Sequence, residues 1–394
     1  MNKNSSMVLI KSGTLVTAEK SFKADVLIKA GKLETIAPDL SVPDAEIIDA
    51  EGMLIMPGGV DPHTHFDLPM FNTVSSDDHY TGHKAAAFGG TTTVMDFVPQ
   101  PENGPLADGV KAWHAKADPK AVIDFGFHMN ITRLDEKIKA EIPKLLELGI
   151  PTLKVFMAYN GVLRLQDREI FKVMKIAKEN NMLTMLHAEN GDVIDVLVEE
   201  ALKAGNTQTE WHAKTRPAWG AVDAVFRGAA LAAQADTALY IVHMNTAGGA
   251  HQLKYARELG VKVMGETCPQ YLFFTADDLA GQDGAKWVCS PPMRTKIDNS
   301  ALWGSLEDDQ IQVVATDHCA FFLDGRQSID YEGQQVAIPG KELGRDDFTK
   351  IPNGLPGVGD RLPILWSFGV KQGHITPNQF VALTSTNPAK IYGL

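Results

Sequence analysis

Short apolar runs separated by turn residues occupy the first 56 positions of the chain. Residues 7–10, 26–28 and 33–36 are short runs that are mainly apolar or β-branched, and Ser-Gly, Ala-Gly-Lys and Pro-Asp turns occur in the same region. This pattern is typical of several short β-strands. We therefore expect residues 1–56 to form a small β domain, a partial β-sandwich.

After residue 57 the pattern changes to an apolar strand, a loop and a helix, repeated along the chain. Helices are predicted at 135–148, 167–181 and 247–259, where apolar residues recur at helical spacing. Strands rich in apolar and β-branched residues, as expected for strands covered on both faces, are predicted at 54–66, 91–97, 122–131, 152–158, 183–188, 238–244, 261–267 and 311–317.

Eight strands alternating with helices favour a closed (β/α)8 TIM-like barrel over residues 57–375. A doubly wound open sheet also alternates, but no Gly-rich phosphate loop follows a predicted strand; the Gly-Val-Gly at 357–359 follows a Pro-rich loop. Residues 376–394 are predicted to be a C-terminal helical segment.

Composition narrows the possible partners and the compartment. The 394 residues suit one large α/β domain with an accessory piece, and a formal charge of −12 argues against nucleic acid or an anionic membrane. No run is as long as a membrane span, and we expect a cytoplasmic protein. Cys268, Cys289 and Cys319 have neither zinc-finger nor redox spacing and are expected to be buried hydrophobic residues.

The most informative polar residues are two histidines in Asp-Pro-His-Thr-His (61–65). Residues i and i+2 of a strand point to the same side, so His63 and His65 can reach one point in space and form half of a divalent metal site. Two surface histidines in a turn are the alternative, and the motif alone does not decide between them.

Other polar residues end the remaining predicted strands. His187 ends the fifth strand, His243 the sixth and Asp317 the eighth. The carboxyl ends of all barrel strands surround one mouth, where such barrels hold their active sites. One buried histidine is more often a hydrogen-bonded core residue, but four histidines and an aspartate at matching strand ends indicate a site.

Lys154 lies within the apolar fourth strand, Thr-Leu-Lys-Val-Phe (152–156). Lysine is rarely fully buried unless it is paired. Three interpretations remain open: a side chain that reaches out to solvent, a buried ion pair, or a neutral amine that reacts with carbon dioxide because burial depresses its pKa.

Taken together, these residues resemble the binuclear members of the amidohydrolase superfamily. The similarity is closer to the D-hydantoinase/dihydropyrimidinase family and extends over nearly the whole chain. It rests on Ala-Ala-Ala-Phe-Gly-Gly-Thr-Thr-Thr (85–93), Val-Phe-Met-Ala-Tyr-Asn (155–160), Glu-Thr-Cys-Pro-Gln-Tyr-Leu (266–272), Ser-Pro-Pro-Met-Arg (290–294) and Lys-Glu-Leu-Gly-Arg-Asp-Asp-Phe-Thr-Lys-Ile-Pro-Asn-Gly (341–354).

The resemblance implies two divalent metal ions, with zinc expected and manganese or cobalt as alternatives. His63, His65 and Asp317 would hold one ion, His187 and His243 the other, and a carbamate on Lys154 would bridge both. A hydroxide between the metals would open a cyclic amide, a hydantoin or dihydropyrimidine ring, to the N-carbamoyl amino acid.

The resemblance also assigns roles beyond the metal ligands. Asp317 would take and return the proton, Tyr159 would stabilise the oxyanion, and Ser290 and Asn353 would bind the ring amide through their backbones. For Asp96 and Glu266 two roles are equally favoured, either orienting a ligand histidine or making structural hydrogen bonds. The remaining histidines that we do not expect to be ligands are His79, His83, His128 and His318.

The residues after the His-x-His motif bear on the substrate. Dihydroorotases carry an arginine there, whereas this chain continues with Phe66 and Asp67, which disfavours an acidic substrate. A pocket for an apolar ring substituent would be lined by Phe66, Leu68, Met70, Phe71, Val162 and Leu163. An allantoinase-like hydrolase of cyclic ureides and a non-catalytic scaffold are the alternatives, and a homo-oligomer, a dimer or a tetramer, is expected.

Two features differ from the family pattern. Family members continue with further strands after Asn-Pro-Ala-Lys-Ile-Tyr-Gly-Leu (387–394), so we expect either a truncated sequence or a partner surface that covers the small β domain. The segment 321–340 is longer than the usual loop and is expected to cover the pocket or to bulge from the surface.

Overall fold

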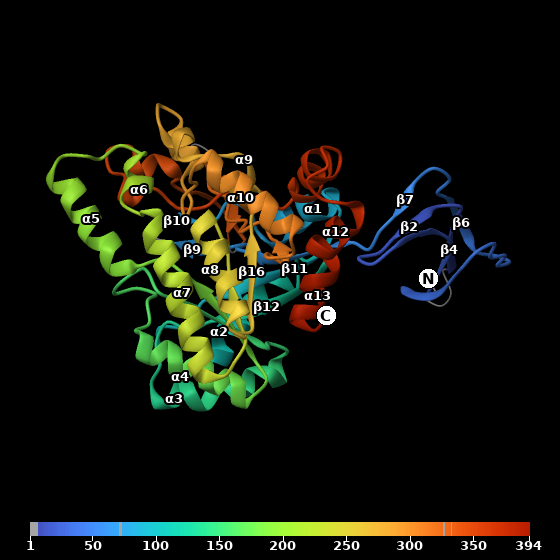
Figure 1. The fold of residues 1–394 in the computed structure, drawn as a ribbon, viewed down its shortest axis with the longest axis horizontal. Coiled ribbons are helices and arrows are strands. Elements are labelled where there is room, and N and C mark those ends of the chain that lie inside the picture. Colours follow the sequence, from blue (N-terminus) through green and yellow to red (C-terminus); the bar gives the residue numbers. More distant parts are fainter. Residues whose placement is uncertain (1–6, 71–72, 326–327, 332) are drawn as a thin grey trace.

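The chain folds into a parallel barrel with a small β domain set apart on one side (Figure 1). The structure is a computed structural model that describes residues 7–70, 73–325, 328–331 and 333–394. Eight parallel strands form the barrel sheet in sequence order. They are β8 (Gly59–Thr64), β11 (Thr91–Val98), β12 (Asp124–Asn130), β13 (Thr152–Phe156), β14 (Leu183–His187), β15 (Leu239–Ile241), β16 (Val263–Thr267) and β17 (Val313–Val314).

The sheet closes where the first strand meets the segment after the last one, along a line that we call the seam. Thr64 and His318 form a parallel bridge, and the amide of His65 donates to the carbonyl of His318 over 2.7 Å. At the other end of the seam, the buried Arg361 donates to the carbonyls of Val60 and Val314. The prediction of a (β/α)8 barrel is confirmed.

Helices pack around the barrel. Gly228 of α7 lies close to the barrel, because a Cβ atom at this position would come within 2.3 Å of the Leu186 side chain and force it to move. The main helices are α1 (His79–Phe88), α2 (Leu106–Ala117), α3 (Glu136–Glu141), α4 (Asp167–Glu179), α5 (Gly191–Lys203), α6 (Trp211–Lys214), α7 (Ala218–Ala235), α8 (Ala247–Glu258), α9 (Pro269–Phe273) and α10 (Lys296–Glu307).

The boundaries of four predicted segments need correction. Residues 54–66 are not one strand, because β7 (Leu54–Ile55) pairs with the small domain and β8 begins only at Gly59. The barrel strands β15 and β17 end at Ile241 and Val314, so His243 and Asp317 lie in the turns that follow them. Residues 135–148 form α3 followed by a 3₁₀ helix, Ile142–Leu148.

The small domain consists of two sheets, with strand orders β5-β4-β1-β6 and β3-β2-β7. Its first sheet exposes apolar side chains, with Leu33 68% and Ile47 62% exposed. The strands besides β7 are β1 (Met7–Lys11), β2 (Thr14–Val16), β3 (Ser21–Lys23), β4 (Asp25–Lys29), β5 (Lys32–Ala37) and β6 (Glu46–Asp49).

The end of the chain packs against the barrel. Residues 376–394 form α12 (Pro377–Val381), a π-helical turn and α13 (Asn387–Tyr392). The ring of Tyr392 joins a buried cluster with Phe97 and Tyr240. In the 321–340 segment, β18 (Ser328–Tyr331) and β19 (Gln334–Ala337) pair as an antiparallel hairpin. Among the described residues, no helix is long and apolar enough to cross a membrane.

Candidate functional site

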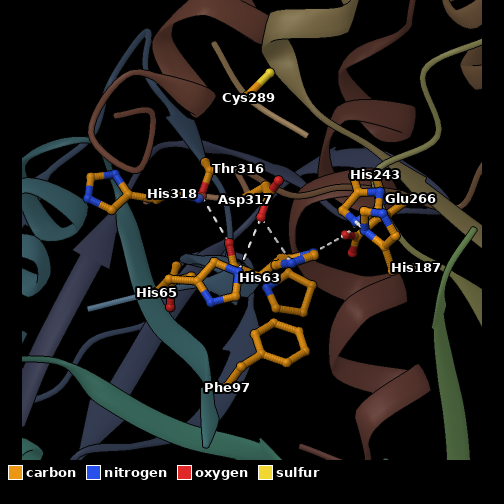
Figure 2. A network of polar contacts seen from close by, with 12 residues as sticks. His63, His65, Phe97, His187, His243, Glu266, Cys289, Thr316, Asp317 and His318 are labelled. Carbon is orange, nitrogen blue, oxygen red and sulfur yellow. Dashed lines mark hydrogen bonds and ion pairs between the residues drawn. The ribbon is translucent and has the colours of Figure 1, made fainter. Parts of the chain in front are cut away.

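Three of the predicted ligands meet across the seam of the barrel (Figure 2). Asp317 Oδ1 lies 3.1 Å from His63 Nε2 and 3.2 Å from His65 Nε2. One potential ligand atom from each of the three residues lies within 4.8 Å of the others. His63 lies in β8, His65 directly follows it and Asp317 follows β17, so the ends of the first and last strands of the barrel together form this group.

His187 and His243 form a second group beside the first. His187 Nδ1 lies 2.9 Å from His243 Nε2, and the ring centroids of His63 and His243 are 5.5 Å apart. Two imidazole nitrogens that face each other at this distance can hold one cation between them. The histidines that the sequence assigned to two ligand groups are therefore brought together in two adjacent pairs.

Lys154 is buried in the barrel wall, where the carboxylates of Asp317 and Glu266 act on it only through their charge. Its side chain lies over the rings of Phe97 and Phe156, with Nζ 4.8 and 5.3 Å from their centroids, and the residue is 2% exposed. Within the described part of the chain, Nζ makes neither a hydrogen bond nor an ion pair. Two of the three interpretations of this lysine, a solvent-reaching chain and a buried ion pair, are thus not supported by the geometry.

Three residues of the site have left-handed backbones. The φ angles are 68° at Tyr159, 39° at His243 and 52° at Asp317. Non-glycine residues adopt this region at a cost of about 1–3 kcal/mol, and such strain concentrates at functional sites. The turn that follows each strand directs these side chains.

The electrostatics of the first group favour positive charge. Burial alone would lower the pKa of His63, but the carboxylates of Glu266 and Asp317 outweigh it and raise that pKa to about 9. Burial likewise opposes the ionisation of Asp317, yet His63 and His65 hold its pKa well below the usual value. The same carboxylates would attract a metal cation, which takes the place of the proton on His63 when it binds.

The other imidazoles stay neutral. Burial lowers the pKa of His65 to about 4, and it also lowers the pKa values of His187 and His243. Neutral imidazole is the form that binds a metal. Burial also lowers the pKa of Lys154 to about 8, which leaves part of this amine neutral near physiological pH.

Tyr159 lies next to the second histidine pair, with its ring centroid 5.1 Å from that of His187. Burial raises its pKa to about 12, so its hydroxyl remains a proton donor. Asn353 Nδ2 donates to Ser290 Oγ over 3.1 Å, so the two predicted substrate-binding loops are in contact.

Glu266 and Asp96, which the sequence left open, have different surroundings. Glu266 contacts His63 Nδ1 through Oε1 and accepts a hydrogen bond from the hydroxyl of Tyr240 over 2.8 Å. Asp96 instead accepts from the backbone amides of Phe66 and Phe97. The geometry favours an orienting role for Glu266 and a structural role for Asp96.

The other histidines are used elsewhere. His79 and His83 contact each other on α1, while His128 contacts Thr152 and the carbonyl of Pro62. His318 contacts Asp77. None belongs to the group of candidate ligands found among the described residues. All three cysteines are free and buried, as predicted.

The predicted substituent pocket needs one correction. Phe66 is fully buried, and its ring contacts His79 and His83 on α1. It therefore belongs to the packing beneath this helix and not to a pocket wall. Val162 is exposed, whereas Phe71 lies outside the described residues.

Two residues of the site were missed by the sequence analysis. Glu189 accepts hydrogen bonds from His187 Nε2 over 2.9 Å and from Arg216 Nη1 over 3.0 Å. The spacing His-Ala-Glu (187–189), which repeats the i, i+2 relation of His63 and His65, was a signal for Glu189. No local signal marked Arg216, because it lies between α6 and α7, far along the chain.

Comparisons with known proteins agree with this geometry. A family model described as "Amidohydrolase family" matches residues 54–394. A D-hydantoinase from Geobacillus stearothermophilus is 46% identical over 98% of this chain and 80% of its own length. The crystal structure of a dihydropyrimidinase from Brevibacillus agri, 46% identical, superposes with a TM-score of 0.92 over 98% of this chain and 82% of the other.

A more distant structure has the same fold. An L-hydantoinase (dihydropyrimidinase) from Arthrobacter aurescens is 27% identical and has a TM-score of 0.85, with 98% of this chain and 82% of the other covered. The chain is thus similar along almost its whole length to proteins named for opposite enantiomers, with higher identity to the D-hydantoinase.

Proposed function

The chain belongs to the amidohydrolase family, and on that premise we propose that it hydrolyses the ring amide of a hydantoin or a dihydropyrimidine to the N-carbamoyl amino acid. The observation that carries this proposal is the meeting of His63, His65 and Asp317 across the seam, beside the facing nitrogens of His187 and His243. A non-catalytic scaffold would have no need for these five side chains to converge.

Family membership implies divalent metal ions, and the residues present fit them. The donors are imidazole nitrogens and a carboxylate, a set that suits zinc and also manganese or cobalt. We propose that His63, His65 and Asp317 hold one ion and that His187 and His243 hold the other. Such ions would act as Lewis acids that lower the pKa of water and polarise the ring carbonyl.

Lys154 is proposed to link the two groups after carbamylation. Its neutral amine adds to carbon dioxide and loses one proton, which gives a carbamate anion on a long stem. This proposal is supported by the burial of Lys154, which makes no hydrogen bond or ion pair with the described residues, and by its pKa of about 8. A carbamate would also supply the negative charge that the second histidine pair lacks.

The remaining roles belong to side chains at the mouth. Asp317, which stays ionised because its pKa is low, accepts the proton of the attacking water and returns it to the ring nitrogen as the C–N bond breaks. Tyr159 donates its hydroxyl hydrogen to the oxygen that becomes negative. The loops of Ser290 and Asn353 hold the amide.

A neutral substrate suits the charges at this mouth. Arg216 lies over the ring of Tyr159, and its charge is already balanced by Glu189. No arginine follows His65, where dihydroorotases carry one. A substrate carboxylate would therefore lack the unpaired cation that usually binds it.

The test is a comparison of rates with the metal-loaded protein. Hydrolysis of dihydrouracil and of 5-phenylhydantoin releases one proton per turnover above pH 6 and can be followed with a pH indicator. We expect turnover of at least one of these rings and much slower turnover of dihydroorotate. Turnover of allantoin alone would favour the cyclic ureide alternative, and absence of turnover on all four compounds with metal bound would refute the proposal.

A further inference from the structure

Glu189 is a buried carboxylate at the edge of the site with two specific partners. It is 1% exposed and lies in the short link between β14 and α5. Its Oε2 atom accepts from His187 Nε2 and from Arg216 Nη1, at 2.9 and 3.0 Å. A buried carboxylate needs such partners, but these two also lead directly to residues of the proposed mechanism.

The first partner fixes which nitrogen of His187 is free. When Nε2 carries the hydrogen that Glu189 accepts, Nδ1 must present its lone pair. This Nδ1 is the atom that lies 2.9 Å from His243 Nε2. The hydrogen bond to Glu189 therefore directs the lone pair of His187 toward the other histidine of its group.

The first histidine group has the same arrangement with the nitrogens exchanged. His63 contacts Glu266 through Nδ1 and faces Asp317 with Nε2 at 3.1 Å. Each group thus contains one imidazole that is anchored by a buried carboxylate and one, His65 or His243, without such an anchor. Two independent occurrences of one arrangement argue that the anchors serve the cation sites.

The second partner of Glu189 extends the arrangement to Tyr159. The guanidinium carbon of Arg216 lies 5.5 Å from the centroid of the Tyr159 ring. Arg216 is itself held from behind, because its carbonyl accepts a hydrogen bond from the buried Arg294. One guanidinium therefore contacts both the anchor of His187 and the face of the residue proposed to stabilise the oxyanion.

We propose that Glu189 and Arg216 are a positioning pair that sets the orientation of His187 for the second metal ion and fixes the ring of Tyr159 beside it. This inference rests on the proposed function, since it assigns an orienting role within the proposed two-metal site. Neither residue touches the substrate, and both act through His187 and Tyr159.

The test compares Glu189→Gln with Glu200→Gln, an exposed glutamate on α5 that serves as the matched control. Both variants are purified with zinc and bicarbonate, dialysed against a series of buffered free zinc concentrations, and their metal content per chain is measured by mass spectrometry. The proteins are also loaded with Co²⁺, whose absorption spectrum distinguishes the two sites by comparison with His187→Ala and His63→Ala.

The expected result is selective loss of one metal ion. The wild type and Glu200→Gln should hold two ions, while Glu189→Gln should bind its second ion about 10–100 times more weakly. Its remaining Co²⁺ spectrum should match that of His187→Ala. Glu189→Asp, which keeps the charge but withdraws the carboxylate, should show the same selective weakening and serves if the glutamine variant does not fold.

Other outcomes would refute either the positioning role of Glu189 or the proposed two-metal site. If Glu189→Gln holds both ions as tightly as the wild type, or loses both equally, the positioning role is refuted while the two-metal site stands. If the wild type itself binds no more than one ion, the proposed two-metal site fails first. Arg216→Lys should lower kcat more than it changes KM, because it disturbs Tyr159, and an unchanged kcat would refute that half of the proposal.

Discussion

Replacement of Thr316 by valine tests how the seam of the barrel holds the site together. The hydroxyl of Thr316 donates to Asp61 Oδ2 over 2.6 Å, and its amide donates to Asp61 Oδ1 over 3.1 Å. Asp61 Oδ1 also accepts from the amide of His63 over 3.3 Å. Asp61 thus joins β8 to the residue that directly precedes Asp317.

The expected loss of stability follows from these contacts. Valine keeps the shape of threonine but removes one hydrogen bond to a fully buried carboxylate, which is worth about 1.5–3 kcal/mol. The hydroxyl also accepts from the amide of His318, but that amide keeps the carbonyl of His63 as an acceptor. With an unfolding entropy of about 2.1 cal/mol/K per residue, the 394 residues give about 0.8 kcal/mol/K. Thr316→Val should therefore lower the Tm by about 2–4 °C.

The chain offers a matched control in Thr184. This residue is fully buried in β14, and its hydroxyl has no hydrogen-bond partner among the described residues. Thr184→Val removes a buried hydroxyl without breaking a contact, so its Tm should stay within about 1 °C or rise. Both variants are melted by calorimetry at one scan rate, and equal shifts would refute the role assigned to the Thr316–Asp61 contact.

Three further predictions concern single side chains. The first concerns zinc-dependent reactivation of the apoprotein at a fixed concentration of dissolved carbon dioxide. Its rate should rise with pH and level off above about 8, because burial lowers the pKa of Lys154 to that value and only the neutral amine reacts. A constant rate from pH 6.5 to 9 would contradict this. Tyr159→Phe should lower kcat about 10²–10³-fold with little change in KM, and a change confined to KM would count against the role. Because burial raises the pKa of Tyr159 to about 12, wild-type kcat should show no loss due to this residue below pH 10. Lys341→Met should stabilise the protein by about 1–3 kcal/mol at pH 7, because burial lowers the pKa of Lys341 to about 8. The substitution removes the hydrogen bond from Lys341 Nζ to the carbonyl of Val288, but this carbonyl still accepts from the amide of Gly354. In the unfolded chain the lysine keeps its proton up to about pH 10.5, so wild-type stability should rise between pH 8 and 10.5. The stability advantage of the variant should therefore vanish by about pH 10.5. An advantage that persists at this pH would refute the lowered pKa of Lys341 as its cause.

The strand pattern of the barrel could be predicted because fully covered strands leave a strong apolar signal. All eight predicted segments contain a barrel strand, since their apolar runs have no other way to be buried. The error at residues 54–66 arose because only three residues, 56–58, separate β7 from β8 in the sequence. Only their partners, β2 in one sheet and β11 in the other, separate them.

The candidate ligands could be found because unusual polar residues stand out against apolar strands. What the sequence could not give is how His243 and Asp317 reach the site. They lie beyond the ends of β15 and β17, and their left-handed backbones turn them inward. Such a conformation at a non-glycine residue has no clear sequence signature, because the surrounding structure imposes it. Arg216 was missed for a related reason, since its contact with Glu189 depends on how the loop before α7 packs.

The position of the first ligand group ties closure of the barrel to cation binding. His63 lies in the first strand, His65 directly follows it and Asp317 follows the last strand, so the group is complete only when the seam is closed. A cation that binds across the seam must therefore favour the closed barrel by the same free energy with which closure favours the cation. The buried contacts of Asp61 with Thr316 and of Arg361 with both strands then have a second consequence besides stability. They hold His63 near Asp317 before any cation arrives, which reduces the entropy lost on binding and raises the affinity of the site.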